Sequence, residues 1–331
     1  LHKEYRRQRQ MCIRDRMYIG RLRKEGRYST AHVYENALLS FRGFCGTPTV
    51  SFGQVTREHL RCYGQYLYER GLKLNTVSTY MRMLRSIYNR GVESGRAPYV
   101  HRLFHGVYTG VDVRQKKALP ATELHKLLYG DPKSDILRRT QAIAALMFQF
   151  CGMSFADLAH LEKSSLDRNV LHYNRVKTKT PMSVEILDTA KDMIYQLQNR
   201  KPALQDCPDY LFSILNGNKK RKDESAYREY QSALRNFNNH LRGLAKALHL
   251  TSPVTSYTIR HSWATTAKYR GVPIEMISES LGHKSIKTTQ IYLKGFALKE
   301  RTEVNRMNLS YVKNCFCLLY TSPSPRDRQK S

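Results

Sequence analysis

Three residues near the carboxyl end of the chain have types and a spacing that suit chemistry on a phosphate. Arg260 lies 23 positions before His283, which lies 9 positions before Tyr292. A protein nucleophile that attacks a phosphate needs cations where charge builds up and an acid for the leaving oxygen. A tyrosine hydroxyl, with a pKa of about 10, attacks poorly unless the phosphate charge is neutralised, and arginine can hold two phosphate oxygens at once. The three residues therefore predict phosphoryl transfer by a tyrosine.

The segment around His283 must bring it close to Tyr292. Pro273 fits the first turn of one helix, and Gly282 fits a left-handed cap at its end. His283 then falls in a turn, and Ser285 can cap a second helix that carries Tyr292. One continuous helix would separate the two residues by about 13 Å. A turn between the helices lets their side chains converge.

Residues 17–110 show helical periodicity almost throughout, which predicts a small helical bundle. The expected helix starts are Ser29 or Thr30, Thr56, and Asn75 with Thr76. In the last of these helices, Arg82, Arg85 and Arg90 lie mostly away from the apolar face. This basic face would suit a DNA backbone, although solvated arginines are the alternative.

The polar, basic segment 111–120 ends in a proline and predicts a linker. Residues 121–316 then predict a second domain of mixed type. It has a buried helix over 137–150, two strands around a turn at 178–181, and helices to about Met307. The expected fold class is mainly α with a small β-hairpin or sheet.

The formal net charge of +29 predicts a polyanionic partner, most simply nucleic acid. A ribosomal or RNA-binding protein would carry the same charge, so charge alone does not name the chemistry. Away from the ends, the five cysteines Cys45, Cys62, Cys151, Cys207 and Cys315 form no CxxC pair or zinc spacing, which predicts free thiols. The longest apolar runs are too short for a bilayer span. We expect a cytoplasmic, soluble protein.

Both ends of the chain carry an Arg-Asp-Arg tripeptide in an unusual context. The stretches "QMCIRDR" and "CLLYTS" can be encoded by DNA sequences that are reverse complements of one another. The shared DNA sequence resembles the transposase end used to prepare sequencing libraries. We therefore expect residues 1–16 and 317–331 to be non-native, adaptor-derived tails, with natural basic tails as the alternative. Without them the formal charge is about +23.

The stretch "TIRHSWATTAKYRGVPIEMISESLGHKSIKTTQIYL" resembles the signature of the tyrosine recombinase, or phage integrase, family. The resemblance assigns the second-box arginine to Arg260, the His/Trp position to His283 and the nucleophile to Tyr292. "NTVSTYMRMLRSIYNRG" is similar to the family's SAM-like core-binding domain, which implies a catalytic domain after the linker. "VKTK" is similar to the family's Lys-containing β-turn, so Lys177 becomes the general acid, with Lys179 as the runner-up.

Two positions depart from the family pattern. Ser154 stands in "CGMSFAD" where the first-box arginine is usual, with Asp157 at the supporting acidic position. A branch of integrases from mobile elements of anaerobic bacteria resembles this chain in that serine. Arg175, on the same hairpin as the lysine, is the candidate substitute cation. Tyr257 replaces the usual histidine and would act in a supporting role, whereas His261 is expected to be packed or solvent-facing.

The resemblance implies a site-specific recombinase of the integrase or invertase type that cuts double-stranded DNA through a 3′-phosphotyrosyl intermediate. It implies no metal or nucleotide cofactor, and a protein that is monomeric alone and a homo-tetramer on DNA through a C-terminal helix over 296–312. Lys179, Lys284 and Lys287 join the three bundle arginines as expected DNA contacts.

Two alternatives stay open. A DNA-binding regulator, including a cleavage-deficient recombinase, would also show a helix, a turn and a basic second helix at "PIEMISESLGHKSIKTTQIY". A type IB topoisomerase would share the tyrosyl intermediate, but the extension over 296–312 favours a recombinase.

Overall fold

The computed structural model describes most of the chain between residues 10 and 310. Main chain and side chains are described for 17–112, 118–197, 210–215, 223–290, 293, 302–303 and 305–310. For 10–16, 198–199 and 291–292 only the backbone is described. The expected 317–331 tail, the centre of the expected linker at 113–117, and the side chains of 1–16 lie outside this description.

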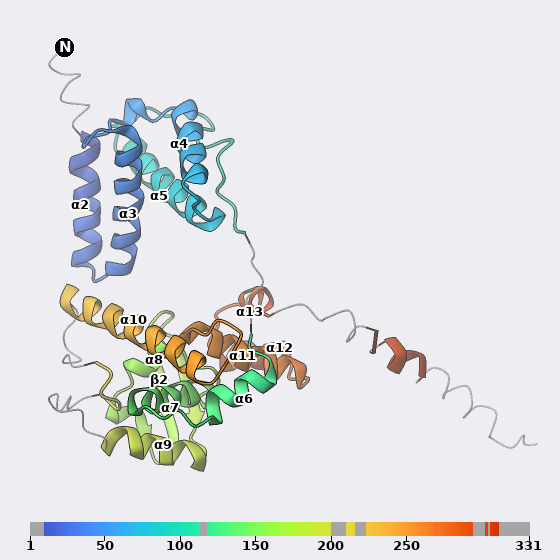
Figure 1. Ribbon diagram of the computed structural model, residues 1–331. Helices are drawn as coiled ribbons and strands as arrows, with labels where there is room; N and C mark the ends of the chain where they lie inside the picture. Colours follow the sequence, from blue (N-terminus) through green and yellow to red (C-terminus); the bar gives the residue numbers. More distant parts are fainter. Residues whose placement is uncertain are drawn as a thin grey trace, which may run out of the picture.

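The N-terminal domain is a helical bundle (Figure 1). Its elements are α2 (Gln10–Lys24), α3 (Tyr28–Cys45), the 3-10 turn η1 (Phe52–Gln54), α4 (Arg57–Glu69) and α5 (Leu74–Glu93). Buried aliphatic and aromatic side chains from all of these elements form one core, in which Leu22, Phe41 and Tyr63 are almost fully enclosed.

One of the three expected helix starts in this domain is confirmed. Thr56 caps α4, and its side chain accepts a hydrogen bond from the His59 backbone N–H at 3.1 Å. The other two helices begin earlier than predicted. Helix α3 starts at Tyr28 because Gly26, in the left-handed region at φ +72°, has already completed the turn from α2. Helix α5 starts at Leu74, since the Asn75 side chain bonds the Asp112 backbone rather than capping its own helix.

The C-terminal domain combines helices with one small sheet. Its helices are α6 (Ala121–Tyr129), α7 (Asp135–Gln149), α8 (Phe155–Ala159), α9 (Asp188–Asn199), α10 (Glu224–Ala247), α11 (Ser256–Tyr269), α12 (Ile274–Ser280) and α13 (Ile286–Tyr292), with a 3-10 turn η2 (Lys163–Ser165). The predicted buried helix is α7, which starts two residues earlier than expected and packs on α6, α9, α10 and α11. Its buried middle, from Ile143 to Met147, forms the centre of the second core.

The sheet holds three antiparallel strands in the order β1 (Leu166–Asp167), β2 (Val170–Asn174) and β3 (Pro181–Glu185). Leu171 pairs with Val184, and both are buried. The turn between β2 and β3 spans residues 175–180, so the predicted turn at 178–181 starts three residues too late and ends one residue too late. Pro181 is instead the first residue of β3, opposite Asn174. At the first position of a strand, the missing N–H of proline costs little.

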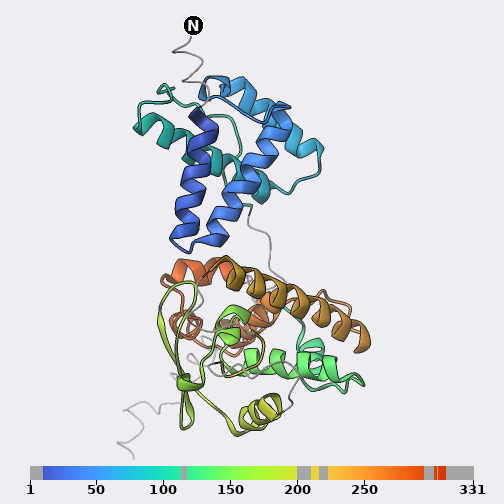
Figure 2. The ribbon, with the colours of Figure 1, turned by 90° about the vertical axis from the view of Figure 1, so that its left-hand side faces the viewer.

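The two domains lie one above the other (Figures 1 and 2). The corner between α2 and α3 meets the beginning of α10, where the Tyr28 and Tyr227 rings stack at 5.8 Å between centroids. Each domain keeps its own hydrophobic core.

None of the helices in the described part of the chain combines the length and apolar character that a bilayer crossing requires. Cys45, Cys62 and Cys151 are free thiols, as expected, while Cys207 and Cys315 fall outside the described residues.

Candidate functional site

Helix α11 holds Arg260 in the interior of the C-terminal domain. Thr255 caps the helix in a reciprocal arrangement with Thr258, which places Arg260 one turn inside. Only 4% of Arg260 is exposed. Its Nη1 donates to the Gly152 carbonyl at 2.8 Å, its Nη2 donates to the Leu281 carbonyl, and Nη2 also lies 3.4 Å from Nε2 of His283. A buried guanidinium is thus held rigidly beside an imidazole.

His283 lies in the turn between α12 and α13, as predicted. Gly282 takes the left-handed conformation after α12, at φ +62°. Pro273 caps α12 rather than forming its first turn, and Ser285 is the N-cap of α13 without a side-chain hydrogen bond. The backbone N–H of His283 donates to the Ser278 carbonyl at 3.0 Å. The backbone of His283 is therefore held in place, and Nε2 of its ring lies beside Arg260.

Arg175 reaches the same turn from the β2–β3 hairpin. Its Nε donates to Oδ2 of Asp157 at 3.2 Å, in an ion pair whose side chains are only 8% and 2% exposed. Its Nη1 donates to the carbonyls of Leu281 at 2.9 Å and Gly282 at 3.1 Å. The Leu281 carbonyl therefore accepts from both Arg175 and Arg260. Two guanidinium groups with one carboxylate give this part of the described structure a net positive charge that suits a phosphate.

The first-box segment supplies support rather than a cation. Ser154 caps α8, and its hydroxyl donates to Oδ2 of Asp157 at 2.7 Å. The backbone N–H of Val176 donates to Oδ1 of Asp157 at 2.8 Å. Ser154 thus helps to orient the carboxylate that holds Arg175. Asp157 joins the first-box segment to the hairpin.

Tyr173 lies close to the charges of Asp157, Arg175 and Arg260. Burial raises the pKa of the Tyr173 hydroxyl, and the Asp157 carboxylate adds to that shift, while Arg175 and Arg260 oppose it. Tyr173 therefore stays protonated at neutral pH and is poorly suited to act as a nucleophile.

The other expected site residues lie at the surface or partly outside the description. Lys177 and Lys179 are exposed on the hairpin turn, and Lys284 and Lys287 are exposed around the start of α13. Tyr292 is the last residue of α13, and its side chain lies outside the described residues.

Tyr257 and His261 lie on one face of α11, one turn apart. Tyr257 is 53% exposed, and its ring meets the ring of His261 edge-on at 4.9 Å. His261 is only 4% exposed, so it is packed rather than solvent-facing.

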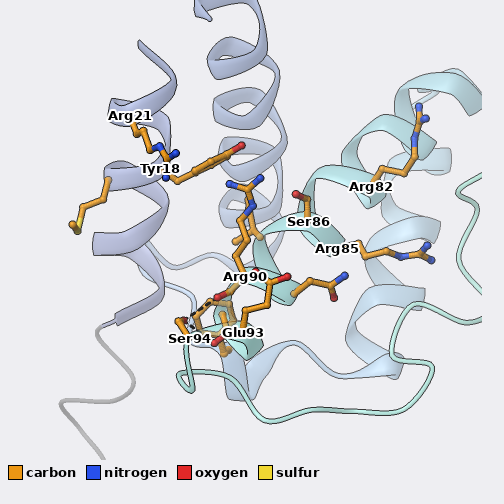
Figure 3. A pocket seen from close by; sticks show the side chains of 13 residues that line it. Tyr18, Arg21, Arg82, Arg85, Ser86, Arg90, Glu93 and Ser94 are labelled. Carbon is orange, nitrogen blue, oxygen red and sulfur yellow. Dashed lines mark hydrogen bonds between the residues drawn. The ribbon is translucent and has the colours of Figure 1, made fainter. Parts of the chain in front are cut away.

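The three predicted bundle arginines line a groove of about 1010 Å³ between α2 and α5 (Figure 3). Arg90 lies over the Tyr18 ring at 3.6 Å and Arg85 lies over the Phe104 ring at 5.4 Å, whereas Arg82 is exposed. Arg21 adds a fourth cation from α2. The aromatic contacts hold two of the arginines in place.

Sequence reasoning missed Thr289, whose hydroxyl lies 2.9 Å from Nδ1 of His283. Its spacing of three residues before Tyr292 was an available signal, since residues i and i+3 share a helix face. It also missed the Gly152 and Leu281 carbonyls that hold the arginines, for which side-chain types give no signal. In the described part of the chain, His, Cys, Asp and Glu side chains form no group of three that could bind a metal ion.

Known proteins share both domains of this chain. The Phage integrase family matches residues 117–297, and the Phage integrase SAM-like domain matches residues 16–101. "Tyrosine recombinase XerD" of Listeria innocua serovar 6a is 25% identical over 276 residues, which cover 80% of this chain and 87% of that protein.

Two solved structures are similar in fold. A lambda integrase tetramer bound to a Holliday junction has a TM-score of 0.56 at 17% identity, covering 81% of this chain and 72% of that one. The Tn1549 transposon integrase in complex with a circular intermediate DNA has a TM-score of 0.61 at 14% identity, covering 88% of this chain and 98% of that one.

The two-domain fold and these relatives define a site-specific DNA recombinase of the tyrosine class. The chain belongs to the phage integrase family. The family, the mainly helical fold class with its small sheet, and the recombinase activity predicted from the sequence are thereby confirmed.

Proposed function

We propose that this recombinase exchanges DNA strands through a 3′-phosphotyrosyl intermediate formed on Tyr292. The Tyr292 hydroxyl oxygen attacks the scissile phosphorus, and the bond from phosphorus to the 5′ oxygen breaks. Lys177 gives a proton to the departing 5′ oxygen, while the tyrosine proton leaves through a network that includes Tyr257. In rejoining, a 5′ hydroxyl from the partner strand attacks the phosphotyrosine and releases the tyrosine. The phosphodiester energy is conserved, so the scheme needs no metal or nucleotide.

The observation that carries this proposal is the convergence of three cationic or proton-bearing side chains on the turn that precedes α13. Arg260 and Arg175 both donate to the Leu281 carbonyl, and His283 follows two residues later, beside Arg260. Helix α13 leaves this turn and ends at Tyr292. The nucleophile is therefore carried by a short helix that starts beside Arg175, Arg260 and His283. These three side chains form the proposed phosphate-binding group.

Arg175 is our candidate for the cation that Ser154 does not provide. An arginine has five N–H donors, and the contacts within the described residues use only Nε and Nη1 of Arg175. The Nη2 donors stay available for a phosphate oxygen. Asp157 fixes the guanidinium plane, so the group needs little reorganisation when DNA binds.

Exposed and partly exposed basic residues on both domains would then contact the DNA backbone. They are Arg82, Arg85 and Arg90 on α5, Lys179 on the hairpin, and Lys284 and Lys287 at α13. We assign residues 17–110 to the core-binding domain, 111–120 to the linker and 121–316 to the catalytic domain, and we treat the ends as adaptor-derived. The two domains would enclose the duplex as a C-shaped clamp.

We further propose that four copies assemble on two DNA sites in the cytoplasm, each docking its C-terminal helix on a neighbour. Residues 305–310 are helical, and Met307 and Leu309 are 64% and 56% exposed. Such apolar side chains are suited to burial by a second copy, and the related lambda integrase has been solved as a tetramer on a Holliday junction. Integration, excision or inversion would follow from the arrangement of the sites in the DNA.

Covalent trapping tests the proposal. Nicked duplexes tiled across the DNA that flanks the gene are incubated with the protein, and DNA-linked protein is separated under denaturing conditions. We expect an adduct with the wild type and none with Tyr292→Phe, with equal binding of intact duplex by both. Tyr269→Phe, an exposed tyrosine on α11, is the matched control and should form the adduct. Binding without any adduct across the authentic sites would favour the regulator.

A further inference from the structure

Thr289 lies between the imidazole of His283 and the end of the helix that carries Tyr292. Its hydroxyl is 2.9 Å from Nδ1 of His283, and the residue is fully buried. Its carbonyl accepts the Leu293 backbone N–H at 2.9 Å, so it belongs to the helical turn that contains Tyr292. Among the α13 side chains that the structure describes, Thr289 alone is buried.

The neighbours of His283 define the role of each ring nitrogen. The guanidinium of Arg260 can only donate hydrogen bonds, so Nε2, at 3.4 Å from Nη2, presents its lone pair in the neutral imidazole. The proton then resides on Nδ1 and is donated to the Thr289 hydroxyl. Arg260 thus sets the tautomer, and the Thr289 hydroxyl, which accepts the Nδ1 proton, holds the plane of the ring so that Nε2 faces the buried guanidinium.

The geometry of α13 extends this contact to the nucleophile. Thr289 and Tyr292 are three residues apart, on the same helix face and separated by about 4.5 Å along the axis. With seven residues, α13 is too short to be stable alone, so tertiary contacts must set its position. The hydrogen bond to His283 is a buried polar contact of that kind.

We propose that Thr289 is a positioning residue that couples the docking of the nucleophile helix to the orientation of His283. When α13 is docked, the ring faces Arg260 and the last helical turn is held against the phosphate-binding group. When α13 is displaced, the ring loses its acceptor as the nucleophile leaves. This inference rests on the proposed role of Tyr292. Through Thr289, it links the orientation of His283 to the position of the helix that carries Tyr292.

The test uses the whole 331-residue chain and the nicked duplex that gives the covalent adduct. Thr289→Val keeps the size of the side chain and removes the hydroxyl, and Thr289→Ser keeps the hydroxyl. Thr288→Val, at an exposed position on the same helix, is the matched control. Loss of one hydrogen bond should slow adduct formation by Thr289→Val about tenfold. Thr289→Ser should recover most of the rate, and Thr288→Val should react like the wild type.

A double-variant comparison separates positioning from packing. If Thr289 acts through His283, Thr289→Val should slow the wild type but leave the rate of His283→Ala unchanged. A wild-type rate for Thr289→Val, or rate losses that multiply in the double variant, would overturn the inference. Thr289→Ala replaces Thr289→Val in each comparison if the valine variant no longer binds duplex DNA. An absent adduct with the wild type would instead refute the proposed function itself.

Discussion

Replacing Asp157 with Asn should destabilise the C-terminal domain by removing one partner of a buried ion pair. The carboxylate accepts from Ser154, from the Val176 backbone and from Arg175, and the ion-paired side chains are only 2% and 8% exposed. An asparagine would direct an amide donor at one of these donors and leave the guanidinium charge without its counter-ion. Breaking a buried pair in this way costs about 3–5 kcal/mol. For a domain of this size, the midpoint of thermal unfolding should fall by on the order of 10 °C.

The magnitude can be checked by calorimetry, and a second variant separates stability from chemistry. In Asp157→Asn with Arg175→Gln, the guanidinium that would lack its counter-ion is itself removed, so part of the lost stability should return. Formation of the covalent adduct should not return, because the proposed second phosphate cation is gone. A fall of less than about 2 °C in the single variant would refute the account of the pair. Full cleavage activity in the double variant would refute the role proposed for Arg175.

Three further predictions concern other elements. Thr56→Ala should lower the stability of the N-terminal bundle by about 1 kcal/mol, measured by urea unfolding, because it removes the cap of α4. Hydrogen bonds from Ser252 and Thr251 lower the pKa of Glu123 to about 2, so its stabilising contribution should be present above about pH 4.5 and fade as pH falls toward 2. Glu123→Gln should therefore unfold at a lower temperature than the wild type at pH 6, and the difference should shrink at pH 2. Arg82→Ala should reduce the slope of log affinity against log salt by about one.

The residue types on either side of His283 correctly predicted that it lies in a turn. Gly282 adopts a left-handed conformation after α12, and a second helix follows, as the sequence pattern required. The same kind of reasoning placed the start of α3 too late and gave Asn75 a capping role. Its side chain instead bonds a segment 37 residues away. Short-range patterns do not contain such contacts, because the partner is brought close only by the fold.

The residue types of the candidate site could be predicted from the sequence, but most of the contacts between these residues could not. The sequence put Arg175 and Asp157 forward separately, and only the packing of the hairpin against α8 and the Leu281–Gly282 turn makes them an ion pair. A side chain on Gly282 would meet Arg175 at 2.5 Å, so this approach depends on a glycine that the sequence explained only as a helix cap. The backbone carbonyls of Gly152 and Leu281 carry no sequence signal at all.

Peptide mapping of the trapped adduct tests the central claim most directly. Trypsin cuts after Lys287 and Lys294, which releases a seven-residue peptide whose one tyrosine is Tyr292. After nuclease digestion, mass spectrometry should find the remaining nucleotide on this peptide, joined through its 3′ phosphate. A nucleotide on any other peptide, or one joined through a 5′ phosphate, would contradict the account.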